Sequence, residues 1–260
     1  MPFDGPQEKW ELYDIRNDFS QGNDLSASHP EKLEELQALF DSEARRNNIY
    51  PLKEPGQTFG PKFAVPDSLG GRTKMTYTAA HVRMPERSVV NVKNCSFRIT
   101  ADITVPERGC EGVLVAQGGN MAGWTLYVNS DGRPVYHYNW FGHEHFVATS
   151  PQPLTPGRHS VVIDHAYDGG FGAGGDSVMS IDGAHVAHVR VEKSVPVIFS
   201  ISGETFDVGL DSGAAVGDYP HIYRFTGAIH GVTIERLSEP SPEVRALIED
   251  AEFRASLAVQ

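Results

Sequence analysis

Hydrophobic and polar residues alternate along most of the chain between Val89 and Leu237, which is the period of a β-strand. In NCSFRITADITV the apolar side chains of one face are Phe97, Ile99, Ala101, Ile103 and Val105. The same pattern predicts strands in HSVVIDHAYD, VPVIFSI and FTGAIHGVTIERL.

Two longer stretches predict β-hairpins. GWTLYVNSDGRPVYHYNWF turns around Ser130–Gly132, and SVMSIDGAHVAHVRV turns at Asp182–Gly183, a pair suited to a two-residue type I′ turn. Many strands joined by turns, with no helix between them, indicate packed antiparallel sheets. We therefore expect a mainly β fold, a concanavalin-like antiparallel β-sandwich (jelly roll) over residues 89–238.

The first region, residues 1–52, predicts one strand followed by one helix. KWELYDI has Trp10 and Leu12 on one face and Tyr13 and Ile15 on the other, so both faces of this strand are apolar. A capping box begins the helix at Ser28. The helix extends to Asn47 or Asn48, and its apolar face consists of Leu33, Leu36, Leu39, Phe40 and Ala44.

The other two regions flank the sandwich. Residues 53–88 are rich in proline and glycine, which predicts a connector without regular structure. Residues 239–260 predict a short C-terminal helix, with Ser241 as N-cap and Pro242 in the first turn.

Charge and composition exclude several functions. The 260 residues contain 22 basic and 34 acidic side chains, a net charge of −12, which argues against nucleic acid as a partner. The sequence has no basic run and no apolar stretch of ~18 residues that would indicate a membrane partner, and no secretory signal is visible. We therefore expect a cytoplasmic protein. Two cysteines, Cys95 and Cys110, make no disulfide framework, so we expect both to be reduced and buried.

Several stretches resemble a known family in order and spacing. KWELYDIRNDFSQGNDLSASHPEKLEELQALFDSEARRNNIYPL resembles the end of the catalytic domain of large bacterial formylglycine-type arylsulfatases. GVLVAQGGNMAGWTLYVNSDGRPVYHYNWFG, VPVIFSISGETFDVGLDSG and FTGAIHGVTIE resemble the β-sandwich that follows that domain. The resemblance extends to about Leu237, and it implies that the main body of a sulfatase fold is missing here.

The catalytic signature of that family is absent from the sequence. Its nucleophile is a formylglycine made from Cys or Ser within C-x-P-x-R. Cys95 is followed by Ser96-Phe97-Arg98, which is one residue short and lacks the proline, and Cys110 is followed by Glu111-Gly112-Val113. The family's metal cage lies in the missing body. No catalytic residue is therefore carried over from the resemblance.

Aromatic residues offer a candidate ligand-binding face. Tyr136, Tyr138 and Trp140 share one face of a regular strand, and Trp124 could join them. On an exposed sheet they would form a stacking platform for sugar rings. The other interpretation, a ladder of core side chains, describes most such patterns.

Acidic and histidine residues offer candidate metal ligands. Asp211 and Asp218 lie in a glycine-rich loop and could bind calcium, although solvated loop carboxylates are the commoner case. His137, His143 and His145 could approach one another, but the sequence places no Cys or Asp beside them, and this favours surface histidines over a zinc site. The sequence therefore requires no cofactor, with calcium left as a possibility.

Two functions remain open. The first is a non-catalytic accessory or structural module that packs on or completes an arylsulfatase. The second is lectin-like binding of carbohydrate or sulfated ligands. For the first, we expect contact with a sulfatase catalytic chain, or self-association, through the apolar residues of the N-terminal region, which are Trp10, Leu12, Leu33, Leu36 and Phe40.

Overall fold

A computed structural model describes residues 10–47, 49–50, 69–201 and 203–258. These residues divide between two compact units, 1–63 with 256–260 and 64–255. No helix in the described ranges is long and apolar enough to cross a membrane. The helices are α1 (Pro30–Arg46), η1 (a 3₁₀ helix, Glu86–Ser88) and α2 (Pro242–Ala258).

Eleven strands lie in the described part of the second unit. They are β1 (Lys74–Tyr77), β2 (Phe97–Val105), β3 (Gly112–Gly118), β4 (Gly123–Val128), β5 (Pro134–Trp140), β6 (Glu144–Thr149), β7 (Gly157–Tyr167), β8 (Ala173–Ile181), β9 (Ala184–Lys193), β10 (Phe206–Val208) and β11 (Ala228–Arg236).

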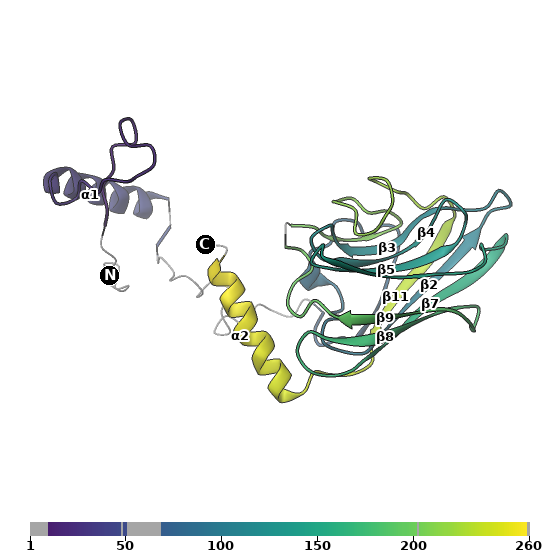
Figure 1. Cartoon of the computed structure of the whole chain (residues 1–260). Coiled ribbons are helices and arrows are strands. Elements are labelled where there is room, and N and C mark those ends of the chain that lie inside the picture. The colour runs from purple at the N-terminus through teal and green to yellow at the C-terminus, as the bar shows by residue number, and fades with distance from the viewer. Residues whose placement is uncertain (1–9, 48, 51–68, 202, 259–260) are drawn as a thin grey trace. The chain divides into compact units, whose positions relative to one another are not determined.

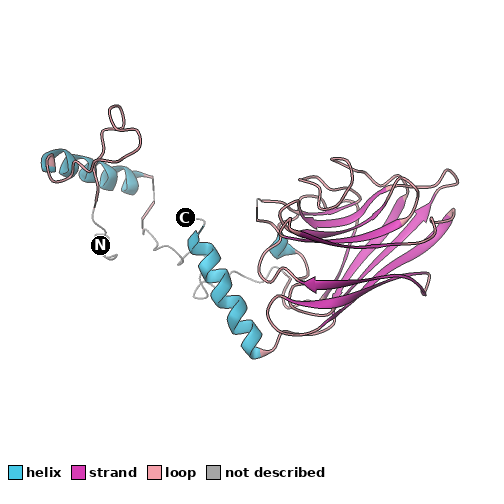
Figure 2. Ribbon diagram, in the orientation of Figure 1, coloured by secondary structure: helices cyan, strands magenta, loops and turns pink. Residues whose placement is uncertain are grey.

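Two antiparallel sheets face each other in this unit (Figures 1 and 2). One has six strands in the order β1-β11-β2-β7-β8-β9, and the other has five in the order β10-β3-β4-β5-β6. The predicted mainly β, antiparallel sandwich is therefore confirmed.

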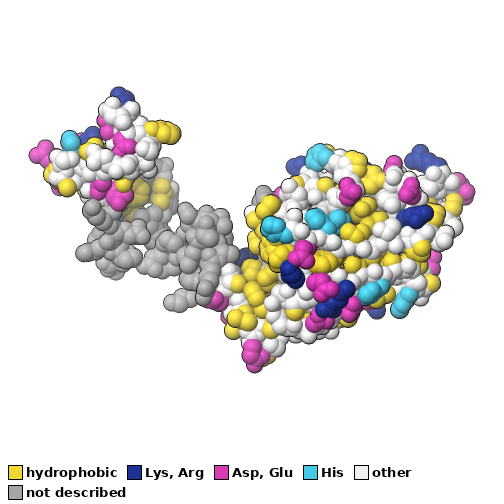
Figure 3. Space-filling view, in the orientation of Figure 1, with side chains coloured by type: hydrophobic (Ala, Val, Ile, Leu, Met, Phe, Trp, Pro, Cys, Tyr) yellow, Lys and Arg dark blue, Asp and Glu magenta, His cyan; other side chains and the backbone are white. Residues whose placement is uncertain are grey.

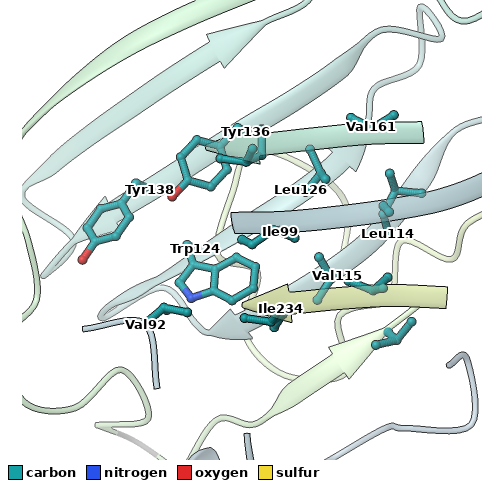
Figure 4. Close-up of a cluster of buried hydrophobic side chains, with 14 of the residues drawn as sticks. Val92, Ile99, Leu114, Val115, Trp124, Leu126, Tyr136, Tyr138, Val161 and Ile234 are labelled. Atoms are coloured by element: carbon teal, nitrogen blue, oxygen red, sulfur yellow. The ribbon is translucent and has the colours of Figure 1, made fainter. Parts of the chain in front are cut away.

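The alternation in β2 predicts the core correctly. Its apolar side chains on one face are all buried between the sheets, and the intervening ones are exposed or half-buried. Figure 4 shows part of this core, where Ile99 and Ile234 of one sheet lie near Trp124 and Leu126 of the other.

Both predicted hairpins are confirmed. β4 and β5 pair around the turn containing Gly132, whose φ of 75° lies in the left-handed region. β8 and β9 join at Asp182 and Gly183, with φ of 51° and 84°, and both central residues of a type I′ turn require positive φ.

The boundary between connector and sandwich lies earlier than predicted. β1 and η1 fall within residues 53–88, yet both belong to the sandwich. β1 pairs with β11, and the carboxylate of Glu86 in η1 accepts a hydrogen bond from Phe199 N. The rest of the predicted connector up to residue 68 lies outside the described residues. The interpretation of VPVIFSI as a strand is wrong, because residues 195–201 form turns and irregular backbone.

The N-terminal unit differs from its prediction in two ways. Residues 10–15 form no strand; instead Leu12 N–H donates to Asp24 Oδ1 at 3.0 Å, and Leu12 C=O accepts from Leu25 N at 2.7 Å. α1 begins at Pro30 with His29 as N-cap and no side-chain cap, so the predicted capping box at Ser28 does not form. A residue before proline is forced out of helical backbone, which moves the helix start past Ser28.

The C-terminal helix α2 is confirmed. Pro242 is its first residue, and the Val244 N–H donates to Ser241 Oγ at 3.3 Å, as an N-cap serine should accept.

Candidate functional site

The aromatic ladder on β5 is part of the core. Tyr136, Tyr138 and Trp124 are buried, and Figure 4 shows them pointing in among aliphatic side chains between the sheets. Val195 N–H donates to Tyr138 Oη at 2.7 Å, so even the hydroxyl has a buried partner. These three residues therefore cannot form the exposed stacking platform that was one interpretation of the sequence.

Trp140, the last member of the ladder, is half-buried at the end of β5. The Lys193 ammonium lies 4.3 Å from the centre of its ring, within range of a cation–π interaction, and Lys193 also pairs with Glu144. One face of the indole is thus already covered by this chain. Trp140 serves as a packing residue at the edge of the core.

Asp211 anchors its own loop. Its carboxylate accepts hydrogen bonds from Gly213 N at 3.3 Å, Val216 N at 3.2 Å and Tyr219 Oη at 2.7 Å. The side chain is buried, and this burial raises the pKa of Asp211, while the hydrogen bonds oppose the shift. Asp218 is exposed in the same loop.

This arrangement does not fit a calcium cage. Calcium takes six to eight oxygen ligands, whereas both oxygens of Asp211 are occupied by donors of the loop. Within the described ranges, no three or more His, Cys, Asp or Glu side chains are grouped so that they could hold a metal ion.

Two of the three candidate histidines do meet, on the outer face of the five-stranded sheet. His137 Nε2 and His145 Nδ1 are 2.7 Å apart. Burial lowers the pKa of His137 to about 4, and repulsion from His145 acts in the same direction, so His137 is neutral at pH 7. His143 lies beside Trp140 instead, and Figure 3 shows histidines at several separate places on the visible face of the sandwich.

A glycine allows the loop to cover His137. A Cβ added to Gly217 would lie 2.9 Å from Tyr219 Cε1, 3.1 Å from His137 Nδ1 and 3.2 Å from Thr125 Cγ2. The loop therefore covers part of this outer face on β3, β4 and β5, and Val216 packs there with Tyr127 and other apolar residues. On β6, by contrast, His145 and Val147 remain exposed.

Neither cysteine is available for chemistry. Cys95 and Cys110 are free and buried, as the sequence predicts. Burial raises the pKa of the Cys95 thiol to about 12 and that of Cys110 to about 11, so both are protonated at neutral pH.

The N-terminal unit carries an exposed apolar surface. Trp10 and Phe40 contact edge to face, with ring centroids 5.6 Å apart, yet they remain 47% and 37% exposed. We call this surface the N-terminal apolar surface; it comprises Trp10, Ile15, Leu36, Leu39 and Phe40. Of the residues predicted to associate, Leu12 and Leu33 are half-buried, while Trp10, Leu36 and Phe40 are exposed.

Sequence reasoning missed a buried ion pair, Lys93 with Glu86, at one end of the sandwich. Glu86 also accepts hydrogen bonds from Phe199 N at 3.0 Å and Ser200 N at 2.9 Å. Nothing in the local pattern marks Glu86 as buried, because the two backbone amides that it accepts from lie more than a hundred positions further along the chain.

No protein-family model and no curated protein matches this sequence. Among solved structures, the sandwich is similar to mouse laminin alpha1 domains LG4-5, with 16% identity and a TM-score of 0.38 over 57% of this chain and 39% of that one. It is also similar to the CBM40 of the Ruminococcus gnavus IT-sialidase bound to alpha2,3 sialyllactose, with 13% identity and a TM-score of 0.42, covering 67% of this chain and 91% of that one.

A third similar structure is the binding domain of botulinum neurotoxin DC in complex with rat synaptotagmin II. It shares 14% identity at a TM-score of 0.42, covering 69% of this chain and 40% of that one. The chain thus spans less than half the length of the laminin and neurotoxin chains that it matches. At this level of similarity, the ligands of these proteins are not assigned to this chain.

Proposed function

We propose that this chain is a non-catalytic module of a formylglycine-type arylsulfatase, which docks on the sulfatase catalytic body through the N-terminal apolar surface. The observation that carries the proposal is the lack of a core in residues 10–50. Among the described side chains of that range only Ser26 and Ala44 are buried. A stretch of about 40 residues whose described side chains form no core needs a partner to be stable.

The resemblance of the same residues to the end of a sulfatase catalytic domain names that partner. In such a domain the α1 residues Leu36, Leu39 and Phe40 would be covered by the body of the fold. Burying a large apolar side chain contributes ~1.5–3 kcal/mol, so covering this surface gives enough free energy for a specific contact. The absence of C-x-P-x-R from the sequence supports a non-catalytic role.

The test is binding to a formylglycine-type arylsulfatase body produced without its own C-terminal region, ending before the segment that matches Trp10. We expect the wild-type chain to bind this body in calorimetry, and Phe40→Asp to weaken binding about a hundredfold, as for an aromatic hot spot. Glu34→Ala, an exposed polar position on the same helix, is the matched control and should bind as wild type. Equal affinities for the three chains would contradict the proposal.

A second candidate function is lectin-like binding at the β5–β6 half of the outer face. The observation that favours it is the exposed imidazole of His145, which His137 holds in place and which can hydrogen-bond to sugar hydroxyls beside the exposed Val147. A glycan array, including sulfated glycans, should then give hits that His145→Ala removes and that His185→Ala, at an exposed position on β9, leaves intact. An array without hits rejects this function.

A further inference from the structure

The outer side of β6 is exposed. His145, Val147 and Thr149 lie on this side, because alternate residues of a strand share a face, and all three are exposed. Val147 pairs with His137 of β5, and Thr149 pairs with Val135. His145 and Thr149 are four residues apart, a span of about 13 Å in a strand. The loop that covers His137 therefore leaves a row of an imidazole, an apolar side chain and a hydroxyl open to a ligand.

Arg133 lies beyond the Thr149 end of this row. It directly precedes β5, and alternation along the strand puts it on the same side as Val135, the partner of Thr149. Its backbone continues the β4–β5 hairpin, since Arg133 C=O accepts from Asn129 N at 3.0 Å. We call Arg133, His145, Val147 and Thr149 the outer strip. A guanidinium thus stands at one end of the outer strip and an imidazole at the other.

Arg133 differs from the other half-buried arginines in having no counter-charge among the described residues. Arg190 pairs with Asp168, and Arg236 pairs with Glu239 at 2.6 Å. Arg133 makes no ion pair and no side-chain hydrogen bond with the described part of the chain, although the sequence has 34 acidic side chains against 22 basic ones. Its Nε is enclosed, so a ligand can reach the guanidinium only at its two Nη groups. These groups present a positive charge that no described carboxylate neutralises.

The chemistry of the outer strip indicates an elongated ligand with an anionic group at one end. A planar guanidinium binds two oxygens of a carboxylate or a sulfate through parallel hydrogen bonds. Because Arg133 is half-buried, solvent screens such a contact less than it would on an open surface. Along the rest of the strip, the imidazole and the hydroxyl can donate to and accept from sugar hydroxyls, and Val147 can pack against the apolar face of a sugar ring.

We propose that the outer strip binds an acidic glycan, whose carboxylate or sulfate group is held by Arg133 and whose sugar hydroxyls bond to His145 and Thr149. This inference rests on the second candidate function, lectin-like binding at the β5–β6 half of the outer face. It adds the charge of the ligand and its orientation on the strip. Arg133 then decides between acidic and neutral glycans, because only an anionic group gains charge-assisted hydrogen bonds from it.

The experiment uses a glycan array of matched pairs, in which two glycans share a neutral core and one carries an added sulfate ester or carboxylate. Calorimetry then measures Kd for both members of each pair that gives a hit, with the full chain. We expect the wild type to bind the acidic member about tenfold more tightly. Arg133→Gln should reduce this ratio to about one, and Arg133→Lys, which keeps the charge without the planar fork, should give an intermediate ratio.

The matched control is Arg158→Gln, at an exposed arginine on β7 of the other sheet, which removes the same charge and should keep the tenfold ratio. Melting temperatures check that each variant is folded. If Arg133→Gln does not fold, the wild-type ratio and Arg133→Lys decide. A larger ratio for the sulfate pairs than for the carboxylate pairs, or the reverse, identifies the anionic group that the site prefers.

The outcomes separate this inference from the lectin-like function. If the array gives hits that His145→Ala removes, but the wild type binds both members of each pair equally or Arg133→Gln keeps the preference, the inference is wrong and lectin-like binding stands. If Arg158→Gln lowers the ratio as much as Arg133→Gln does, the preference comes from the overall charge of the chain, and the inference is again wrong. If no glycan binds, both are overturned.

Discussion

Replacing Tyr138 by Ala is expected to lower the free energy of unfolding by about 3–5 kcal/mol, as for other buried aromatic side chains. The ring lies between the sheets against Phe199, with centroids 6.2 Å apart, and its hydroxyl accepts from Val195 N. The substitution therefore leaves a cavity and an unpaired backbone N–H together. Urea unfolding followed by tryptophan fluorescence measures the loss.

Tyr138→Phe separates the two contributions. It keeps the ring and removes only the hydroxyl, so the expected loss is about 1–3 kcal/mol, the cost of a buried donor without its partner. Thr149→Ala, at an exposed position of β6, is the control and should change stability by less than about 0.5 kcal/mol. A loss below about 1 kcal/mol for Tyr138→Ala would show that the ring is not part of the core.

The alternation of residues predicts the sandwich well because burial enforces it. In β2 every second side chain from Phe97 to Val105 is buried between the sheets, and a slip of one residue would expose them all. Turn chemistry then predicts the hairpins, since Asp182 and Gly183 occupy positive φ that few other residue pairs adopt. Both signals are local, and so they can be seen in one sequence.

The aromatic ladder shows what the periodicity of residues does not predict. Periodicity places Tyr136 and Tyr138 on one face of β5 and His137 on the other, but it does not say which face points inward. The second sheet decides that, and it makes the tyrosines core and brings His137 against His145. The sequence allows His137, His143 and His145 to approach one another, and only the pairing of β5 with β6 selects His137 and His145.

The prediction of a strand in residues 195–201 is wrong for a related reason. The apolar content of this segment is typical of a strand, and Val195 and Phe199 are buried, but its backbone is bound by side chains instead of a neighbouring strand. Glu86 and Asn94 lie about a hundred positions before the amides and carbonyl that they bind, and Tyr138 lies 57 positions before Val195. The pattern of side chains within the segment cannot reveal that the hydrogen-bond partners of its backbone lie so far away in the sequence.

Replacing Lys93 by Met is expected to destabilise the protein by about 3–5 kcal/mol at pH 7, because it leaves the Glu86 carboxylate buried without its counter-charge. The two side chains are 8% and 10% exposed, so solvent screens the pair little. Burial alone would raise the pKa of Glu86, yet Lys93 and the hydrogen bonds from Ser200 and Phe199 together hold that pKa below its usual value. The loss is measured by urea unfolding at pH 7.

The pH dependence of the same variant gives a sharper test. In the wild type, the lowered pKa means that the contribution of Glu86 to stability is present above about pH 4.5 and is lost as the pH falls through the folded pKa. In Lys93→Met the buried carboxyl is expected to have a raised pKa, so protonation on acidification stabilises the folded state. The difference in unfolding free energy between the two proteins should therefore narrow as the pH falls from 7 to 4.

A control variant distinguishes this from a general effect of losing charge. Lys74 pairs with Glu235 at 2.9 Å on the surface, and its side chain is 59% exposed, so Lys74→Met should cost less than about 1 kcal/mol at either pH. If Lys93→Met behaves as Lys74→Met does, Glu86 is already neutral or hydrated in the folded protein. The segment 194–201 would then be held only by Tyr138 and Asn94, and Glu86→Gln should be as stable as the wild type.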